Sequence, residues 1–397
     1  AEALAAARPR VVAALAAHFR DLDLAEDAFA AACEAALRED TPIRDPAAWA
    51  YVTARRRALD VRRKAEREAR AIASQPEVEP MGDVIAFPEP IPDERLRLLF
   101  ICCHPALAVE ARIALALRTI CGVSVARIAR AFLVAEPAMY QRITRAKAKI
   151  GVAKISFETP PAGEWAERVG AVLETLETAL GIAYRNASGE GDTAGLAPEV
   201  ERLAELLAEL MPEEAEAFGV LAVVSLIRSR ENARLDSDGA MVPLSQQDVA
   251  RWDAVRIEAG RRALDRATAL HTPGPMQTLA AIHLTHAMRL HDRPTDWRAI
   301  LRLYDALLAM RPTPVVAINR AVALSRAHSP KDGLAALDEL DADRLADFLP
   351  FHAARADLLA RAGRIAQARA AYDAALALEP EPAEARFLGA QRDALEA

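Results

Sequence analysis

Two groups of side chains in this 397-residue chain have types and spacings that could do chemistry. In the first, Cys102, Cys103 and His104 place two thiols beside an imidazole, as a cysteine nucleophile or a metal site would require. Successive residues of a helix point about 100° apart, so the two thiols do not share a helix face. They also end the apolar run RLRLLFICC just before a proline. The pattern favours a buried helix end over an active site.

The second group is a set of three histidines, His283, His286 and His291. The first two share a helix face because they stand three residues apart, but a metal would need a third ligand, and no Asp, Glu or Cys cluster has a diagnostic spacing. The glycines of SGEGD (188–192) do not follow a strand, which argues against a phosphate cradle. We therefore expect no metal, no cofactor and no enzymatic activity, and we expect packing or capping roles for these histidines.

Basic side chains are concentrated in two segments. Residues 51–73 contain eight Lys and Arg against three acidic residues, and residues 101–157 contain nine against two. Between these segments, residues 74–94 contain six acidic residues, five prolines and no Lys or Arg. Proline at this density interrupts a helix and favours an extended tether. The pattern indicates two small basic domains joined by an acidic linker.

The formal net charge of −7, taken alone, argues against a nucleic-acid-binding protein. The charge is uneven, however. Residues 1–157 carry 24 Lys and Arg against 20 Asp and Glu, a net of +4, and residues 158–397 carry 26 against 37, a net of −11. Binding to nucleic acid depends on the local field of each domain, so the average charge does not exclude it for the first part.

The elements that must position these side chains are helices. Ala, Leu, Arg and Glu dominate a chain that is 52% hydrophobic, and the apolar residues recur at helical spacing. We therefore predict an all-α fold, with Pro46 in the first turn of the third helix and a brief hairpin only within residues 236–244. The length predicts two to four domains.

The same sequence carries signals about its compartment. There is no run of 18 apolar residues that could cross a membrane, and the first residues lack the basic and apolar regions of a signal peptide. The four cysteines form no CxxC pair, which is typical of a reducing environment. We expect a cytoplasmic protein with no membrane partner.

Residues 121–150 have the pattern of a helix-turn-helix. Ser124 is the expected N-cap of the first helix, and Pro137 opens the second. The second helix has an inward apolar stripe formed by Met139, Ile143, Ala146 and Ile150. Such a helix can lie in the major groove, where its early residues contact bases and its later cations contact phosphates. The alternative is an ordinary helical hairpin with a solvated basic face.

These 30 residues resemble the C-terminal DNA-binding region of extracytoplasmic-function (ECF) sigma factors of the sigma-70 family, with Leu133 in place of the usual turn glycine. Residues 21–37 resemble the family's helix that docks on the clamp helices of RNA polymerase, and residues 46–64 resemble its segment that melts the −10 element. The sequence ERLRLLFICCHPAL, the turn AFLVAEPAM and the long extension are similar to one ECF group with a C-terminal tetratricopeptide-type (TPR) region.

The resemblance implies a sigma factor that recruits core RNA polymerase to specific promoters and opens the −10 element without covalent chemistry. It implies region 2 at 1–73, a linker at 74–92, region 4 at 93–157 and a helical extension at 158–397. The residues that it assigns to the −35 element are Ala138, Tyr140, Gln141, Arg142, Arg145, Lys147 and Lys149. Those that it assigns to the −10 element are Trp49, Tyr51, Arg55, Arg56, Arg57, Arg62 and Arg63. Those that it assigns to polymerase are Asp23, Glu26 and Asp27.

The −10 assignment also has a physical basis, since unstacked bases need aromatic side chains and the exposed backbone needs cations. A core position for Trp49, and a merely solvated face for Arg62, Arg63 and Lys64, are the alternatives.

An internal repeat supports the predicted extension. Ala321, Leu324, Gly333 and Leu337 recur 35 residues later as Ala356, Leu359, Ala368 and Tyr372, at TPR-like spacings within residues 314–390. Stacked helix pairs of this kind leave a concave face, which we expect to bind a protein or peptide regulator, unless it packs against the rest of the extension. A non-catalytic TPR-type scaffold or adaptor with a vestigial helix-turn-helix is the alternative function.

Overall fold

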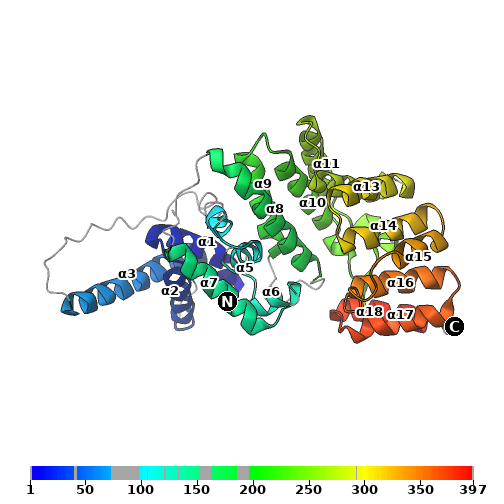
Figure 1. Cartoon of the computed structure of the whole chain (residues 1–397). Coiled ribbons are helices and arrows are strands. Elements are labelled where there is room, and N and C mark those ends of the chain that lie inside the picture. Colours follow the sequence, from blue (N-terminus) through cyan, green and yellow to red (C-terminus); the bar gives the residue numbers. More distant parts are fainter. Residues whose placement is uncertain are drawn as a thin grey trace. The chain divides into compact units, whose positions relative to one another are not determined.

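The structure is a computed structural model (Figure 1) that describes residues 2–39, 43–72, 98–104, 106–119, 122–132, 134–152, 162–185, 196–291 and 293–395. Within these ranges the regular elements are helices, and the β pairing is one isolated bridge between Leu235 and Met241. The all-α prediction is therefore confirmed, and the bridge lies next to the expected hairpin, with Met241 inside residues 236–244 and Leu235 one residue before them. No helix in the described part is both long enough and apolar enough to cross a membrane. The predicted linker and Leu133 lie outside the described residues.

The chain forms two compact units, one of residues 1–182 with 191–206 and the other of residues 183–190 with 207–397. The first unit begins with a bundle of three helices, α1 (Glu2–Phe19), α2 (Leu22–Ala36) and α3 (Pro46–Ile72). The backbone N–H of Leu24 donates to the Asp21 carboxylate at the start of α2, and Asp45 accepts from the first turn of α3 in the same way. Pro46 opens α3, as predicted.

The helix-turn-helix also lies in the first unit. Its helices are α5 (Val109–Thr119), α6 (Val125–Ala131) and α7 (Glu136–Val152), and α7 packs against both of the others. The Ser124 hydroxyl accepts from Arg127 N at 3.3 Å, which confirms the predicted N-cap. The predicted inward stripe of α7 is confirmed too, because Met139, Ile143, Ala146 and Ile150 are all buried.

The two cysteine thiols that precede α5 are packed in the protein interior. Cys102 and Cys103 are fully buried, and the Cys103 Sγ lies 3.9 Å from the hydroxyl of Thr175 on α8 (Ala162–Arg185). The His104 Nδ1 accepts from the backbone N–H of Ala106 at 3.1 Å. These contacts confirm the predicted buried helix end. The next helix is α9 (Leu196–Leu210).

The second unit begins with three tightly packed helices, α10 (Ala215–Arg228), α11 (Ala254–Ala269) and α12 (Pro275–Ala287). Short 3₁₀ turns occupy Glu231–Ala233, Leu244–Gln246, Val249–Arg251 and Met288–His291. The Glu216 carboxylate accepts from the backbone N–H groups of Met276 and Gln277, at 2.8 and 3.2 Å, at the start of α12. Because a helix N-terminus leaves its first N–H groups unpaired, this carboxylate fixes α12 onto α10.

Helix pairs complete the second unit. After α13 (Trp297–Met310) come α14 (Pro314–Ala327), α15 (Pro330–Asp338), α16 (Leu349–Arg361), α17 (Ile365–Ala377) and α18 (Pro382–Asp393). The starts of α14 and α16 lie 35 residues apart, at 314 and 349, and so do those of α15 and α17, at 330 and 365. The 35-residue sequence repeat is therefore a repeat of helix pairs, and it shares one buried apolar cluster.

Candidate nucleic-acid interface

The side chains of α7 divide into an inward stripe, an exposed side and two edges. Since each residue turns the helix by about 100°, the side opposite the buried stripe is centred on Gln141, Thr144, Arg145 and Ala148, all of them exposed. Arg142 lies at one edge and Lys147 at the other, and both are half-buried. Thr144 is absent from the sequence-based set, although a helical projection from the Met139–Ile150 stripe would have found it. The predicted contact Tyr140 is 53% exposed.

A groove runs between α7 and the segment that leads into α5. It has a volume of about 410 Å³, and Leu107, Ala108 and Ala111 form its apolar wall. The α7 side is lined by six residues, namely Ala138, Gln141, Arg142, Arg145, Ala146 and Lys149. Five of the seven residues predicted for the −35 element thus share one surface. This lining holds three cations and no acidic residue, which makes the groove attractive to phosphate.

The residues predicted for the −10 element differ in their exposure to solvent along α3. Tyr51 is buried in the three-helix bundle and Arg55 is half-buried, whereas Arg56, Arg57, Arg62 and Arg63 are exposed. Trp49 is half-buried and borders a hollow of about 460 Å³, which is also lined by Glu39, Ile43, Arg44, Asp45, Ala48 and Val52. An aromatic side chain at the edge of a hollow can stack on an unpaired base. Arg44 and Asp45 were missed because their position around Trp49 depends on the turn before α3.

The residues predicted for polymerase lie on α2, and two of them are engaged in ion pairs. The Lys147 Nζ lies 2.9 Å from the Asp23 carboxylate and 2.5 Å from the Glu26 carboxylate. The Arg8 Nη2 lies 3.0 Å from the other Glu26 oxygen. Burial alone lowers the pKa of Lys147, but Glu26 and Asp23 outweigh burial and raise this pKa above its ordinary value. Asp27 is exposed.

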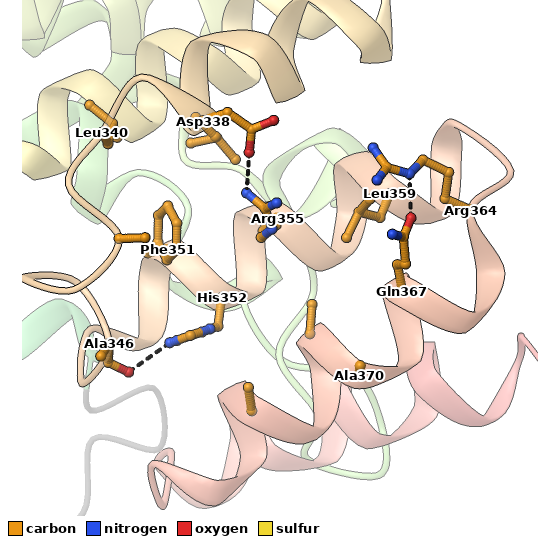
Figure 2. Close-up of a pocket in the computed structure, with 14 residues that line it drawn as sticks. Asp338, Leu340, Ala346, Phe351, His352, Arg355, Leu359, Arg364, Gln367 and Ala370 are labelled. Atoms are coloured by element: carbon orange, nitrogen blue, oxygen red, sulfur yellow. Dashed lines mark hydrogen bonds and ion pairs between the residues drawn. The ribbon is translucent and has the colours of Figure 1, made fainter.

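The second unit contains a groove of about 560 Å³ between the end of α15, α16 and α17 (Figure 2). Phe351 and Leu359 of α16 form its apolar floor, and Ala370 lies on the α17 side. Its polar groups pair within the groove. The Arg355 guanidinium lies 2.6 Å from the Asp338 carboxylate, and the Arg364 guanidinium donates to the Gln367 side chain. The groove therefore combines an apolar floor with a polar rim, in which the Asp338 carboxylate offsets the charge of Arg355.

The histidines of α12 are neutral packing groups. The Arg230 Nη2 donates to the His283 Nδ1 at 3.1 Å, which requires an unprotonated Nδ1. Burial and then the charge of Arg230 lower the pKa of His283 well below its ordinary value, and the same two causes lower the pKa of His286 to about 4. In the described part of the chain, no three His, Cys, Asp or Glu side chains come together as metal ligands.

The lowered pKa of His286 predicts a loss of stability in acid. An unfolded histidine titrates near pH 6.5, so below that pH the unfolded chain binds a proton that folded His286 does not take up until about pH 4. His286 alone should lower the free energy of unfolding by about 2 kcal/mol between about pH 7.5 and about pH 5, in addition to the contribution of His283. Urea unfolding at the two pH values tests this. In His286→Phe, which keeps an aromatic ring, the fall should be smaller; an equal fall in both proteins would contradict the assignment.

Comparisons with known proteins match two segments of the chain and one relative over its whole length. Residues 97–150, which include α5 to α7, match the family model described as Sigma-70, region 4. Residues 168–268 match a family of unknown function, DUF6596. The chain is 42% identical over 408 residues to uncharacterized protein R00370 of Rhizobium meliloti (strain 1021), an alignment that covers 100% of this chain and 95% of the relative. The chain therefore belongs to the same family as protein R00370, and it contains a segment that matches Sigma-70, region 4.

Proposed function

We propose that the protein is an ECF-type sigma factor that recruits core RNA polymerase to specific promoters and opens the −10 element. The observation that carries this proposal is the cation-lined groove along α7, within the segment that matches Sigma-70, region 4. A helix held in this way can enter the major groove with its exposed side toward the bases. In this proposal Gln141, Arg142 and Arg145 contact bases or lie near them, and Lys149 contacts phosphate.

The −10 element would bind along α3. The hollow beside Trp49 supports stacking of an unpaired base, and the exposed arginines that follow on α3 support binding of the separated strand. Tyr51 would act from inside the bundle by holding α3 in place, because its side chain is buried. Asp23, Glu26 and Asp27 would meet polymerase.

The second unit would govern this activity. The repeated helix pairs and the groove of Figure 2 support a TPR-type region that binds a protein or peptide regulator. The same groove also favours the second candidate function, a non-catalytic scaffold or adaptor. The two functions differ in one property, since only a sigma factor makes initiation by core polymerase depend on promoter sequence.

Two substitutions in α7 test the division between base and phosphate contacts. Arg142→Ala should reduce the preference for a cognate −35 duplex over a scrambled one by about 1–3 kcal/mol. Lys149→Ala should weaken binding to both duplexes equally and should reduce the salt slope of log K by about 1. Fluorescence anisotropy at several salt concentrations measures both quantities. Equal losses on both duplexes for both variants would contradict the proposed roles.

A further inference from the structure

The groove of Figure 2 lies where the second unit departs from its own repeat. Helices α15 and α17 are equivalent in the repeat, but α15 has 9 residues and α17 has 13. A helix of 13 residues that began at Pro330 would end at Ala342, whereas α15 ends at Asp338. Leu340 and Ala342 line the groove instead of continuing the helix. The groove therefore opens beside the turn of helix that α15 lacks.

The sequence explains why α15 ends early. Asp338 and Asp341 are weak helix formers, and the Asp341 carboxylate accepts from the backbone N–H of Arg344 at 3.2 Å. A carboxylate that accepts from an N–H three residues later caps a new turn rather than extending the preceding helix. The chain then uses residues 339–348 to reach the start of α16. The opening of the groove is therefore encoded in the residues of this loop.

The groove has the length of a short helix. Its lining extends from Phe351 to Leu359 on α16 and from Arg364 to Ala374 on α17, which correspond to about 12 and about 15 Å. This length matches two to three turns of an α-helix, about 5.4 Å each. None of the described residues that line the groove belongs to α14 or α18. The groove thus follows the two helices of one pair, and not the concave face expected along the first helices of successive pairs.

One end of the groove is acidic. Ala342 and Ala346, which line this end, belong to the loop 339–347. The loop contains four exposed acidic residues and one Arg, a net charge of −3. The adjacent carboxylate of Asp338 is already paired with the Arg355 guanidinium at 2.6 Å. A cation at this end would therefore meet carboxylates of the loop that surround it from the solvent side.

The opposite end of the groove is basic. Arg361 and Arg364 flank the turn from α16 to α17, and Arg364 lines the groove. Burial lowers the pKa of Arg361, and the charge of Arg326 on α14 lowers this pKa further, so the two guanidinium groups are close. Asp357, at 3.7 Å from Arg361, offsets part of this charge. Three arginines and one aspartate leave a net charge of +2 at this end.

We propose that this groove binds a short amphipathic helix of a partner protein, with Lys or Arg at its first end, Asp or Glu at its last end and apolar side chains between. The inference rests on the proposed function, in which the second unit binds a protein or peptide regulator, and it names the chemistry of the bound segment. The apolar side chains would cover the floor beside the turn that α15 lacks. The helix dipole favours the N-terminus at the acidic end and the C-terminus at Arg361 and Arg364.

Two peptides of equal composition test the match of charge. Both are fluorescein-labelled, about 14 residues long and neutral, with leucines at helical spacing and equal numbers of Lys and Glu. In the segregated peptide every Lys precedes every Glu, and in the mixed peptide the two alternate. We expect the full chain to bind the segregated peptide roughly 5–10-fold more tightly in fluorescence anisotropy, with a preference that decreases as salt is added. Equal affinity for the two peptides would overturn the inference.

A matched pair of substitutions on α17 assigns the binding to the groove. Ala366 and Ala370 are both exposed and stand one turn apart, but only Ala370 lines the groove. Lysine is a good helix former, so both Ala370→Lys and Ala366→Lys should fold. The lysine at 370 would obstruct the groove, and we expect it to weaken binding of the segregated peptide by about 10-fold or more. Ala366→Lys should change this affinity by less than about 2-fold.

A second pair of variants tests the acidic end and does not depend on Ala370→Lys. Asp343→Asn removes an exposed charge from the loop 339–347, and Asp238→Asn removes one from an exposed turn that does not line the groove. We expect Asp343→Asn to weaken binding of the segregated peptide by roughly 2–3-fold more than Asp238→Asn does. Equal effects of the two variants would contradict the predicted position of the Lys residues.

The outcomes separate this inference from the sigma role, because neither polymerase nor promoter DNA enters the binding assay. A preference for the segregated peptide that Ala370→Lys removes supports the inference, even if run-off transcription shows no promoter-dependent initiation, in which case only the sigma role fails. If the chain promotes initiation but Ala370→Lys and Ala366→Lys bind the segregated peptide alike, the inference is wrong and the sigma role stands.

Discussion

Met139→Asp is expected to abolish DNA binding by the recognition helix. Met139 is fully buried in the stripe that fixes α7 against α5 and α6. Burying an unpaired carboxylate costs several kcal/mol, and a small helical domain has little stability to spare. We expect the helix-turn-helix to lose its packing and the affinity for a cognate −35 duplex to fall by about 100-fold or more, which corresponds to about 2.7 kcal/mol.

The measurement combines anisotropy on the duplex with hydrogen exchange over residues 98–152. Met139→Leu is the matched control, because a volume-conserving apolar exchange usually costs less than about 1.5 kcal/mol, and it should keep both duplex binding and protection of α7. If Met139→Asp bound the cognate duplex as wild type does, α7 would not be the element that contacts DNA.

Gly260→Leu is expected to destabilise the second unit strongly. A Cβ atom at Gly260 would lie 2.6 Å from the Leu226 side chain and 3.1 Å from the Ala222 carbonyl oxygen, so α10 and α11 pack at a distance that only glycine permits. The side chain of Leu226 can move, but the backbone of α10 cannot move without breaking its packing on α12. Overpacking of this kind costs about 3 kcal/mol or more.

For a unit of this size, about 3 kcal/mol corresponds to a fall in Tm of roughly 6–12 °C, which calorimetry resolves. Gly389→Ala in α18 is the control, because its added methyl group would meet no heavy atom within 4 Å beyond the neighbouring backbone of its own helix. It should leave the unit unchanged or stabilise it by up to about 1 kcal/mol, since alanine favours a helix over glycine. Equal Tm values for wild type and Gly260→Leu would contradict the packing described for α10 and α11.

Local features of this fold were predictable from the sequence because they depend on neighbours along the chain. The Ser124 cap, the position of Pro46 and the buried stripe from Met139 to Ile150 all follow from helical periodicity and capping chemistry. The 35-residue repeat was predictable for the same reason, because equivalent positions such as Ala321 and Ala356 recur at a fixed spacing.

Long-range pairs were not predictable in this way. Lys147 stands 121 residues from Glu26 in the sequence, so nothing local distinguishes it from the neighbouring cations that are proposed to bind phosphate. Trp49 and Tyr51 are two residues apart on α3, and only the packing of α1 and α2 decides that Tyr51 is buried while Trp49 borders a hollow. The Arg230–His283 contact, across 53 residues, is a further example.

Run-off transcription with core RNA polymerase tests the central claim most directly. Templates are first selected from a randomised promoter library by their binding to the full chain with core polymerase. Transcription from these templates by core polymerase with the full chain is then compared with transcription by core polymerase alone. We expect transcripts of defined length that require the chain, that disappear when the selected −35 or −10 sequence is scrambled, and that are lost with Met139→Asp. Selection of no promoter sequence, or equal transcription with and without the chain, would contradict the sigma role and favour a scaffold.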